Sequence, residues 1–154
     1  MLNYQKLLDK LPTLIYVNDE SGIKVDFYNQ AWYDYTGMSK TDVEAGWSHI
    51  VHPNDLHRVV EEITKASKQG KPYEITLRLL HKPTGSYKWF LSICTPILDD
   101  NGKTEAWIGT SLDINRAKIS HKDMEKVFDQ NIESRLTRIK ELEEELKINK
   151  IKSK

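Results

Sequence analysis

The chain has 154 residues, with 23 Lys or Arg and 23 Asp or Glu, so its formal net charge is zero. This balance argues against a protein that binds nucleic acid or a membrane surface through bulk positive charge. The single cysteine excludes an internal disulfide and suits a reducing compartment. No apolar stretch is long enough for a signal peptide or a bilayer span, so we expect a soluble cytoplasmic protein with one domain and an appendage.

The first quarter of the chain combines a short helical pattern with two strand patterns. Residues 2–11 place their leucines near one helical face, and Pro12 ends the run, which predicts a short amphipathic helix. Residues 13–18 and 23–28 predict two strands separated by a turn. In the second strand we expect one side to carry Ile23, Val25 and Phe27, and the other to carry Lys24, Asp26 and Tyr28.

Two helices are predicted in the next part of the chain. Asn29 suits the N-cap of a helix over residues 30–36, because its side chain can accept a hydrogen bond from a free backbone N–H. A longer helix is predicted from about residue 54 to 68, since Pro53 suits its first turn and Gly70 its end.

Three further strands are predicted at residues 73–81, 89–98 and 105–113. The Asp-Asp-Asn-Gly sequence at 99–102 tolerates positive φ and joins the last two strands as a hairpin. The order of strands and helices predicts an α+β fold, with an antiparallel sheet of about five strands and the helices gathered on one face.

The predicted hairpin has two different faces, and both are expected to be buried. One face is bulky and carries Trp89, Leu91, Ile93, Ile108 and Leu112. We expect the N-terminal helix, through Leu7 and Leu8, or a partner subunit to cover it. The other face mixes large aromatic and small residues, namely Phe90, Ser92, Cys94, Trp107, Gly109 and Ser111. Small residues beneath aromatics leave room for a cavity, or they let a helix approach closely; both interpretations stay open.

Residues 115–154 are charged, lack Gly and Pro, and predict one long helix. Near-heptad spacing gives a seam that Arg135 interrupts, formed by Phe128, Ile132, Ile139, Leu142 and Leu146. A single helix this charged buries too little surface to be stable alone, so we predict that it pairs with a second copy. A helix folded back on its own domain, or a frayed tail, remains the alternative.

A series of short motifs runs from about residue 10 to 115. It comprises Asn29-Gln30-Ala31, Tyr35-Thr36-Gly37, Gly46-Trp47, Val51-His52-Pro53-Asn54-Asp55, Arg78, Gly85, Trp89, Pro96, Asp99, Gly102, Gly109 and Leu112-Asp113-Ile114. On these residues the chain resembles a PAS domain, in the subclass with a Gly-Trp…His-Pro-Asp-Asp segment. Three mild departures are Asn54 in place of Asp, Pro83-Thr84-Gly85 in place of Lys-Asp-Gly, and Asn115 in place of Thr.

The resemblance implies a five-stranded sheet cupped by helices, a pocket between them, and sensing or signal relay rather than catalysis. It divides the chain into an N-terminal helix (1–11), a PAS domain (12–114) and a signalling helix (115–154). The expected pocket adds Trp32, Tyr35, Val59 and Ile63 to the mixed face of the hairpin. The resemblance also implies a homodimer with contacts on the bulky face.

Three residues resemble reactive groups without their usual context. Cys94 lies on a strand, outside the Asn-Cys-Arg motif of flavin-binding light sensors, so we interpret it as a core residue. His57 is too early on its helix for the haem ligand of haem-binding PAS domains. His121 lacks the Glu-Leu-Arg-Thr-Pro continuation of a kinase phosphoacceptor. We expect no metal, we disfavour haem and flavin, and we find no catalytic motif.

These observations favour a dimeric sensor or relay module whose C-terminal helix acts on an effector outside this chain. A histidine kinase, a cyclic-dinucleotide enzyme or a DNA-binding domain would suit that role, and the chain is then a piece of a longer receptor. Two alternatives stay open. One is a constitutive dimerisation scaffold with its pocket filled by its own side chains, and the other is the N-terminal regulatory domain of a transcription factor.

Overall fold

A computed structural model describes the backbone of residues 3–41, 43 and 46–152. The first residues of the predicted N-terminal helix and the last two of the predicted signalling helix lie outside this range. The chain divides into two compact units, Met1–Asn115 and Arg116–Lys154, which we treat separately.

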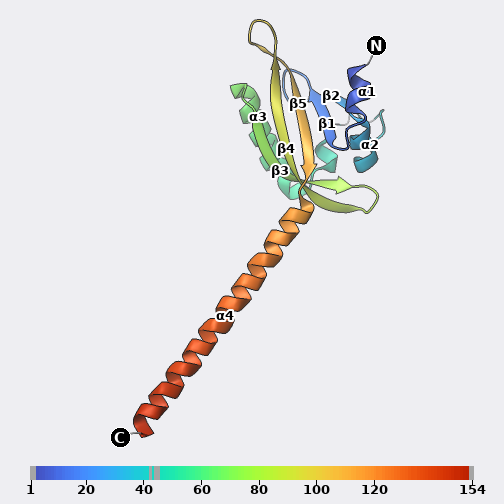
Figure 1. Cartoon of the computed structure of the whole chain (residues 1–154). Helices are drawn as coiled ribbons and strands as arrows, with labels where there is room; N and C mark the ends of the chain where they lie inside the picture. The colour runs from blue at the N-terminus through green and yellow to red at the C-terminus, as the bar shows by residue number, and fades with distance from the viewer. Residues whose placement is uncertain (1–2, 42, 44–45, 153–154) are drawn as a thin grey trace. The chain divides into compact units, whose positions relative to one another are not determined.

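The helices and strands follow the predicted order, with ends that differ by a few residues (Figure 1). The helices are α1 (Tyr4–Leu8), α2 (Gln30–Thr36), the 3-10 helix η2 (Ser48–Ile50), α3 (Pro53–Gln69) and α4 (Asn115–Lys152). The strands are β1 (Leu14–Asn18), β2 (Val25–Tyr28), β3 (Tyr73–His81), β4 (Ser86–Leu98) and β5 (Thr104–Asp113).

The five strands form one antiparallel sheet in the order β2-β1-β5-β4-β3. The long β4–β5 hairpin lies at its centre, and β5 pairs with β1 on its other side. The sequence predicted this α+β fold and this hairpin, and both predictions are confirmed.

The strict alternation predicted for the second strand is wrong. β2 pairs Phe27 with Val17 and Val25 with Asn18, so Asp26 is an extra residue opposite a single step of β1. Such a bulge reverses the side to which the following residues point. Val25 and Tyr28, predicted on opposite sides, therefore both reach the interior, with 7% and 2% of their surfaces exposed.

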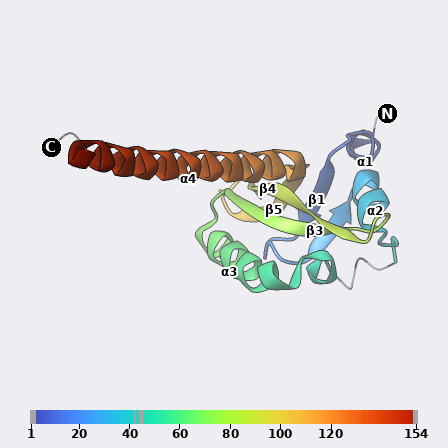
Figure 2. The ribbon, with the colours of Figure 1, turned by 90° about the horizontal axis from the view of Figure 1, so that it is seen from below.

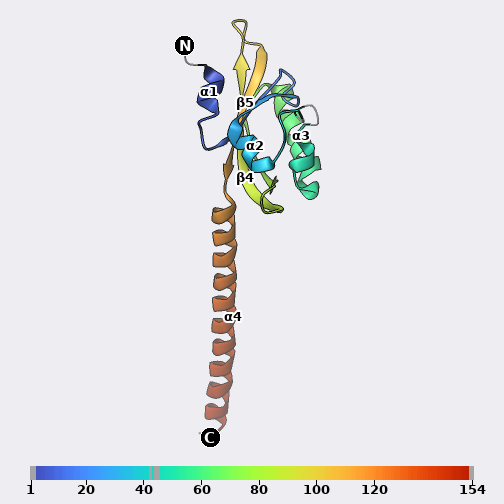
Figure 3. The same cartoon turned by 90° about the vertical axis from the view of Figure 1, so that its right-hand side faces the viewer.

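Helices α2 and α3 cover one face of the sheet (Figure 3). Helix α2 packs on β1 and β3, and α3 packs on β3. The Asn29 side chain caps α2 as predicted, by accepting a hydrogen bond from the Trp32 N–H, and Gly37 ends the helix with positive φ. The main hydrophobic core fills the space between these helices and the sheet.

The N-terminal helix lies on the other side of the sheet from α3 (Figures 2 and 3). The Asn29 amide holds its end by donating to the Leu8 carbonyl, and the Gln30 N–H donates to Asp9 Oδ1. None of its described residues is buried. The helix is therefore tied to the start of α2 by polar contacts rather than by an apolar face.

Helix α4 is exposed to solvent along the part whose burial is described. Every side chain whose burial is described between Arg116 and Glu145 is exposed. Within the described residues, no helix is both long and apolar enough to cross a bilayer.

Candidate functional site

A cavity of about 40 Å³ lies between the sheet and the helices. Side chains from all five strands and from both covering helices surround it. Its lining consists of Tyr16, Asn18, Val25, Tyr28, Trp32, Trp47, Val51, Val59, Ile63, Tyr73, Ile75, Leu77, Leu79, Ser92 and Ser111. A water molecule needs roughly 10–15 Å³ of such space, so the cavity has room for water or a very small molecule.

The ten residues expected to line a pocket fall into two groups. Those that surround the cavity are Trp32, Val59, Ile63, Ser92 and Ser111. The other five do not line the cavity, for reasons that their neighbours explain; they are Tyr35, Phe90, Cys94, Trp107 and Gly109. The Tyr16 ring covers Gly109, where an added Cβ would lie 2.1 Å from Tyr16 Cζ. Phe90 packs edge-on against Tyr35, with ring centroids 5.1 Å apart.

Trp107 and Cys94 are the remaining excluded residues, and both are fully buried. The Trp107 indole donates to the Glu20 carbonyl, beyond the end of β1. Burial raises the pKa of the Cys94 thiol, which keeps it protonated and a poor nucleophile. The interpretation of Cys94 as a core residue agrees with this environment.

Sequence reasoning missed the tyrosines that form much of the cavity wall. Tyr28 was assigned to the wrong side because the bulge at Asp26 leaves no signal in the alternation. Tyr16 and Tyr73 lie on β1 and β3, away from the hairpin whose small residues suggested the pocket. Both strands were predicted, and strands that pair with the hairpin also contribute side chains to its pocket face, so this was the available signal for Tyr16 and Tyr73.

Three hydroxyl groups form a chain along one wall of the cavity. The Tyr16 hydroxyl lies 2.8 Å from Ser92 Oγ, which accepts from Ser111 Oγ at 3.1 Å. Burial raises the pKa of Tyr73, and the neighbouring Tyr16 and Cys94 raise it further. Burial also raises the pKa of Tyr16. The phenols therefore stay neutral at physiological pH.

Besides the Tyr73 hydroxyl, three buried polar groups at the cavity have no hydrogen-bond partner within the protein. They are Asn18 Oδ1, the Tyr28 hydroxyl and Trp32 Nε1. Each belongs to a side chain at least nine-tenths buried. Tyr28 and Trp32 stack with their ring centroids 4.6 Å apart, so one aromatic pair carries two of these groups. Unpartnered buried polar groups are rare, and water or another small molecule in the cavity would satisfy these three.

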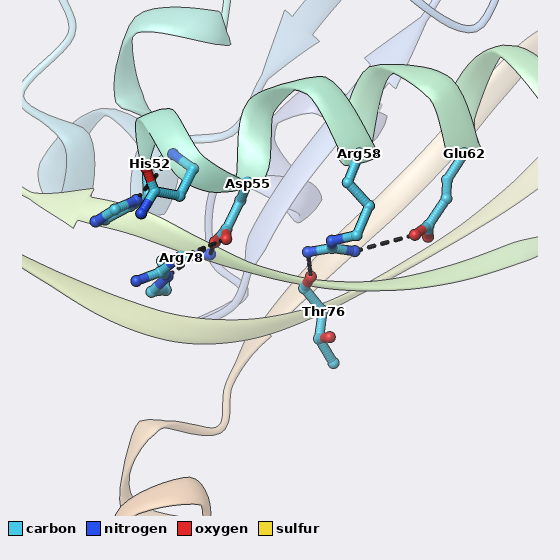
Figure 4. Close-up of polar contacts among 7 residues, drawn as sticks. His52, Asp55, Arg58, Glu62, Thr76 and Arg78 are labelled. Atoms are coloured by element: carbon cyan, nitrogen blue, oxygen red, sulfur yellow. Dashed lines mark hydrogen bonds and ion pairs between the residues drawn. The ribbon is translucent and has the colours of Figure 1, made fainter.

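A second polar cluster lies where α3 begins (Figure 4). Arg78 of β3 grips the Asp55 carboxylate through Nε at 2.9 Å and Nη2 at 2.7 Å, and its backbone N–H donates to the same group. These hydrogen bonds lower the pKa of Asp55. His52 Nδ1 accepts from the Asn54 N–H, which supports the turn at Pro53.

Arg58, one turn further along α3, makes a second link to β3. Its Nη2 donates to the Thr76 carbonyl at 2.6 Å, and its Nη1 pairs with Glu62 on the same helix (Figure 4). Two arginines thus join α3 to β3. The link through Arg78 continues into β4, because its guanidinium lies 5.0 Å from the centroid of the Trp89 ring.

Trp89 contacts the residues at the start of α4. Its carbonyl accepts from the Ile114 N–H at 2.9 Å, and its N–H donates to Asn115 Oδ1 at 3.1 Å. The Asn115 N–H in turn donates to Asp113 Oδ1. Asn115, which stands where the family motif has Thr, therefore links the first residue of α4 to β4 through its side chain.

The bulky face of the hairpin is less covered than expected. Ile108 and Leu112 are 37% and 42% exposed, and Trp89, Leu91 and Ile93 are half-buried. Leu7 is exposed and Leu8 half-buried. The single chain leaves this face partly open to solvent, so cover by a partner stays a prediction.

The described seam residues of α4 are all exposed, namely Phe128, Ile132, Ile139 and Leu142. The side chain of Leu146 lies outside the described part of the structure. Off the seam, His121 Nδ1 lies 3.5 Å from Glu125 Oε1 in a solvent-exposed pair. The described residues contain no group of three or more His, Cys, Asp or Glu side chains arranged for a metal ion.

Two curated relatives are similar to this chain in sequence. The uncharacterized protein y4lL of Sinorhizobium fredii is 27% identical over 132 residues, which are 86% of this chain and 15% of that protein. The peroxide stress-activated histidine kinase mak3 of Schizosaccharomyces pombe is 22% identical over 75% of this chain and 5% of its own length. The chain thus spans a small part of the length of both proteins.

A solved structure is similar over nearly its whole length. It is the N-terminal domain of a diguanylate cyclase with a PAS/PAC sensor from Marinobacter aquaeolei. The two share 26% sequence identity and a TM-score of 0.59, over 69% of this chain and 98% of that one. Residues 25–111, more than half of the chain, match the PAS fold family. The chain belongs to the PAS family of sensory domains.

Proposed function

We propose that this chain is a dimeric sensory relay module, in which a change at the cavity alters the start of α4. One observation carries the proposal. A continuous set of contacts runs from α3, which lines the cavity, through β3 and β4 to the first residue of α4. The histidine kinase and the diguanylate cyclase among the similar proteins support an effector of this kind beyond α4.

The first step of the relay is a movement of α3. Val59 and Ile63 of this helix line the cavity, and Asp55 lies one turn before Val59 on the same helix. A helix moves largely as a rigid rod, so a molecule that displaces Val59 or Ile63 also displaces Asp55. The Asp55 carboxylate would carry Arg78 with it through their paired hydrogen bonds.

The second step passes from Arg78 to α4. The guanidinium lies over the Trp89 ring, and the Trp89 backbone holds Ile114 and Asn115. A shift of Trp89 therefore strains or releases the hydrogen bonds that begin α4. In a paired helix, a small rotation at this end would be passed along the seam to an effector.

Hydrogen exchange tests the relay without any ligand. Arg78→Ala removes the side-chain link to Trp89 and leaves the backbone pairing of β3 with β4, whereas Arg58→Ala removes a link of the same residue type that ends at β3. We expect the Ile114 amide to exchange about tenfold faster in Arg78→Ala, a change of roughly 1.4 kcal/mol in local opening. We expect little change at this amide in Arg58→Ala once both rates are corrected for global stability.

Arg78→Lys keeps the charge but loses the planar fork, so we expect it to restore only part of the protection. Equal exchange at Ile114 in the two alanine variants would refute the relay, because a general weakening of the α3–β3 contact would then explain both.

A constitutive dimerisation scaffold is the second candidate, and the small volume of the cavity favours it. It predicts a dimer whose helix pairing is the same for every substitution at the cavity. A changed distance between spin labels on two copies of α4 in Val59→Ala would favour the relay over the scaffold.

A further inference from the structure

We infer that the cavity binds a small uncharged molecule that both donates and accepts hydrogen bonds, as a primary amide does. This inference rests on the proposed function and names the ligand class that the relay would detect. It comes from three unpartnered groups, from the neutral lining and from the size of the space.

The unpartnered groups require both a donor and an acceptor on the ligand. Trp32 Nε1–H only donates, so it needs an acceptor. Asn18 Nδ2 donates to the Gly22 carbonyl at 2.8 Å, which orients the amide and leaves Asn18 Oδ1 as an acceptor without a donor. The Tyr28 hydroxyl can do either. A ligand with a carbonyl beside an N–H or O–H group can accept from Trp32 Nε1, donate to Asn18 Oδ1 and do either with the Tyr28 hydroxyl.

The walls of the cavity disfavour a charged ligand. Among the described lining residues, none is Asp, Glu, Lys, Arg or His. Burial raises the pKa of Tyr28, so its hydroxyl also remains neutral at physiological pH. An ion buried there would lose its hydration without meeting an opposite charge, which costs far more than burying a neutral amide that is fully hydrogen-bonded.

The size of the cavity limits the ligand to a few heavy atoms in this conformation. The space is about 40 Å³, well below the roughly 300–1,000 Å³ of pockets that hold drug-sized ligands. The wall that carries Tyr28 and Trp32 has two unpartnered polar atoms, so the space suits water, which such a ligand would displace.

Three isosteric probes test the charge requirement in the whole chain. Acetamide, acetate and acetamidinium have the same number of heavy atoms and nearly the same shape, but at pH 7 they are neutral, negative and positive. The readout is the Trp32 indole N–H signal in a ¹H–¹⁵N correlation spectrum at constant ionic strength. The Trp89 indole, which does not line the cavity, is the internal control.

We expect acetamide to shift the Trp32 signal with a saturable dependence on concentration, and the two ions to give no saturable shift. Tyr28→Phe removes one partner and keeps the ring, so we expect binding to weaken several-fold. Tyr33→Phe is the matched control, because Tyr33 contacts the Tyr28 ring but does not line the cavity. It should leave the affinity unchanged.

Four results would overturn the inference: no saturable shift with acetamide, equal shifts with all three probes, tighter binding of either ion, or equal loss in Tyr28→Phe and Tyr33→Phe. The relay is measured separately, because the exchange experiment on Arg78→Ala uses no ligand. A relay that works with no acetamide binding would refute the ligand class alone, and acetamide binding without the relay would refute the function alone.

Discussion

The two units of this chain obtain their stability in different ways. Residues 3–115 bury a core that includes fully enclosed side chains such as Phe90, Leu79 and Trp107. Helix α4 has apolar side chains of similar size, but all those described are exposed, including Phe128 at 66% and Met124 at 70%. A large apolar side chain therefore stabilises the core of residues 3–115, whereas the same side chain on α4 is exposed to solvent in the single chain.

The difference shows what each unit needs from its surroundings. The PAS unit, residues 3–115, buries most of its apolar side chains in its own core, apart from those on the bulky face. The long helix has few intrinsic means of stabilisation, because isolated helices depend on burying an apolar face against something else. A second copy of α4 would supply that surface, and four predictions sharpen this contrast.

The largest effect is expected from a matched pair of phenylalanine substitutions. Phe90→Ala opens a cavity in the core and should lower the free energy of unfolding by about 3–5 kcal/mol. Phe128→Ala should change the unfolding of the PAS unit by less than about 0.5 kcal/mol. Urea unfolding at low protein concentration, followed by tryptophan fluorescence, measures both. Equal losses would mean that Phe128 also belongs to the core of the PAS unit.

Helix pairing gives the next effect. The double variant Ile139→Lys with Leu142→Lys puts two charges on the predicted seam, and it should weaken a helix-paired dimer about a hundredfold or more. Leu136→Lys with Thr137→Lys adds the same charge beside the seam and serves as the control. Sedimentation equilibrium measures the dissociation constant. If both double variants stay dimeric, the seam does not hold the dimer, and the bulky sheet face becomes the better candidate.

The ion pair at α3 should make stability depend on pH. The folded pKa of Asp55 is lowered, so the stabilising effect is complete above the unfolded value of 3.8 and is lost as the pH falls through the lower folded pKa. Asp55→Asn should cost about 1–3 kcal/mol at pH 6 and much less near pH 2. Urea unfolding at the two pH values checks this. A constant difference would show that the charge of Asp55 has no part in the effect.

The smallest effect is expected from the His121–Glu125 contact on α4, which is an ion pair only when His121 is protonated. His121 and Glu125 are 75% and 66% exposed in their side chains, so solvent screens their attraction. Glu125→Gln should leave both the urea midpoint and the dimer dissociation constant within experimental error. A loss comparable to that of Asp55→Asn would indicate that this pair is buried in the assembled protein.

Local sequence patterns predicted most elements well, because their causes are local. The cap at Asn29 and the left-handed glycines that end α2 and α3 follow from side-chain chemistry within a few residues. The central hairpin follows from its turn and its β-branched strands. The candidate site was predicted only in part, since half of the expected lining residues surround the cavity.

The sequence by itself therefore determined the order of the elements and the fold class. Only the tertiary structure decided which side chains meet at the cavity and which touch the start of α4. The bulge at Asp26 turns Tyr28 inward, and the Tyr16 ring covers Gly109. Both depend on pairing between segments far apart in the chain, which no local pattern records.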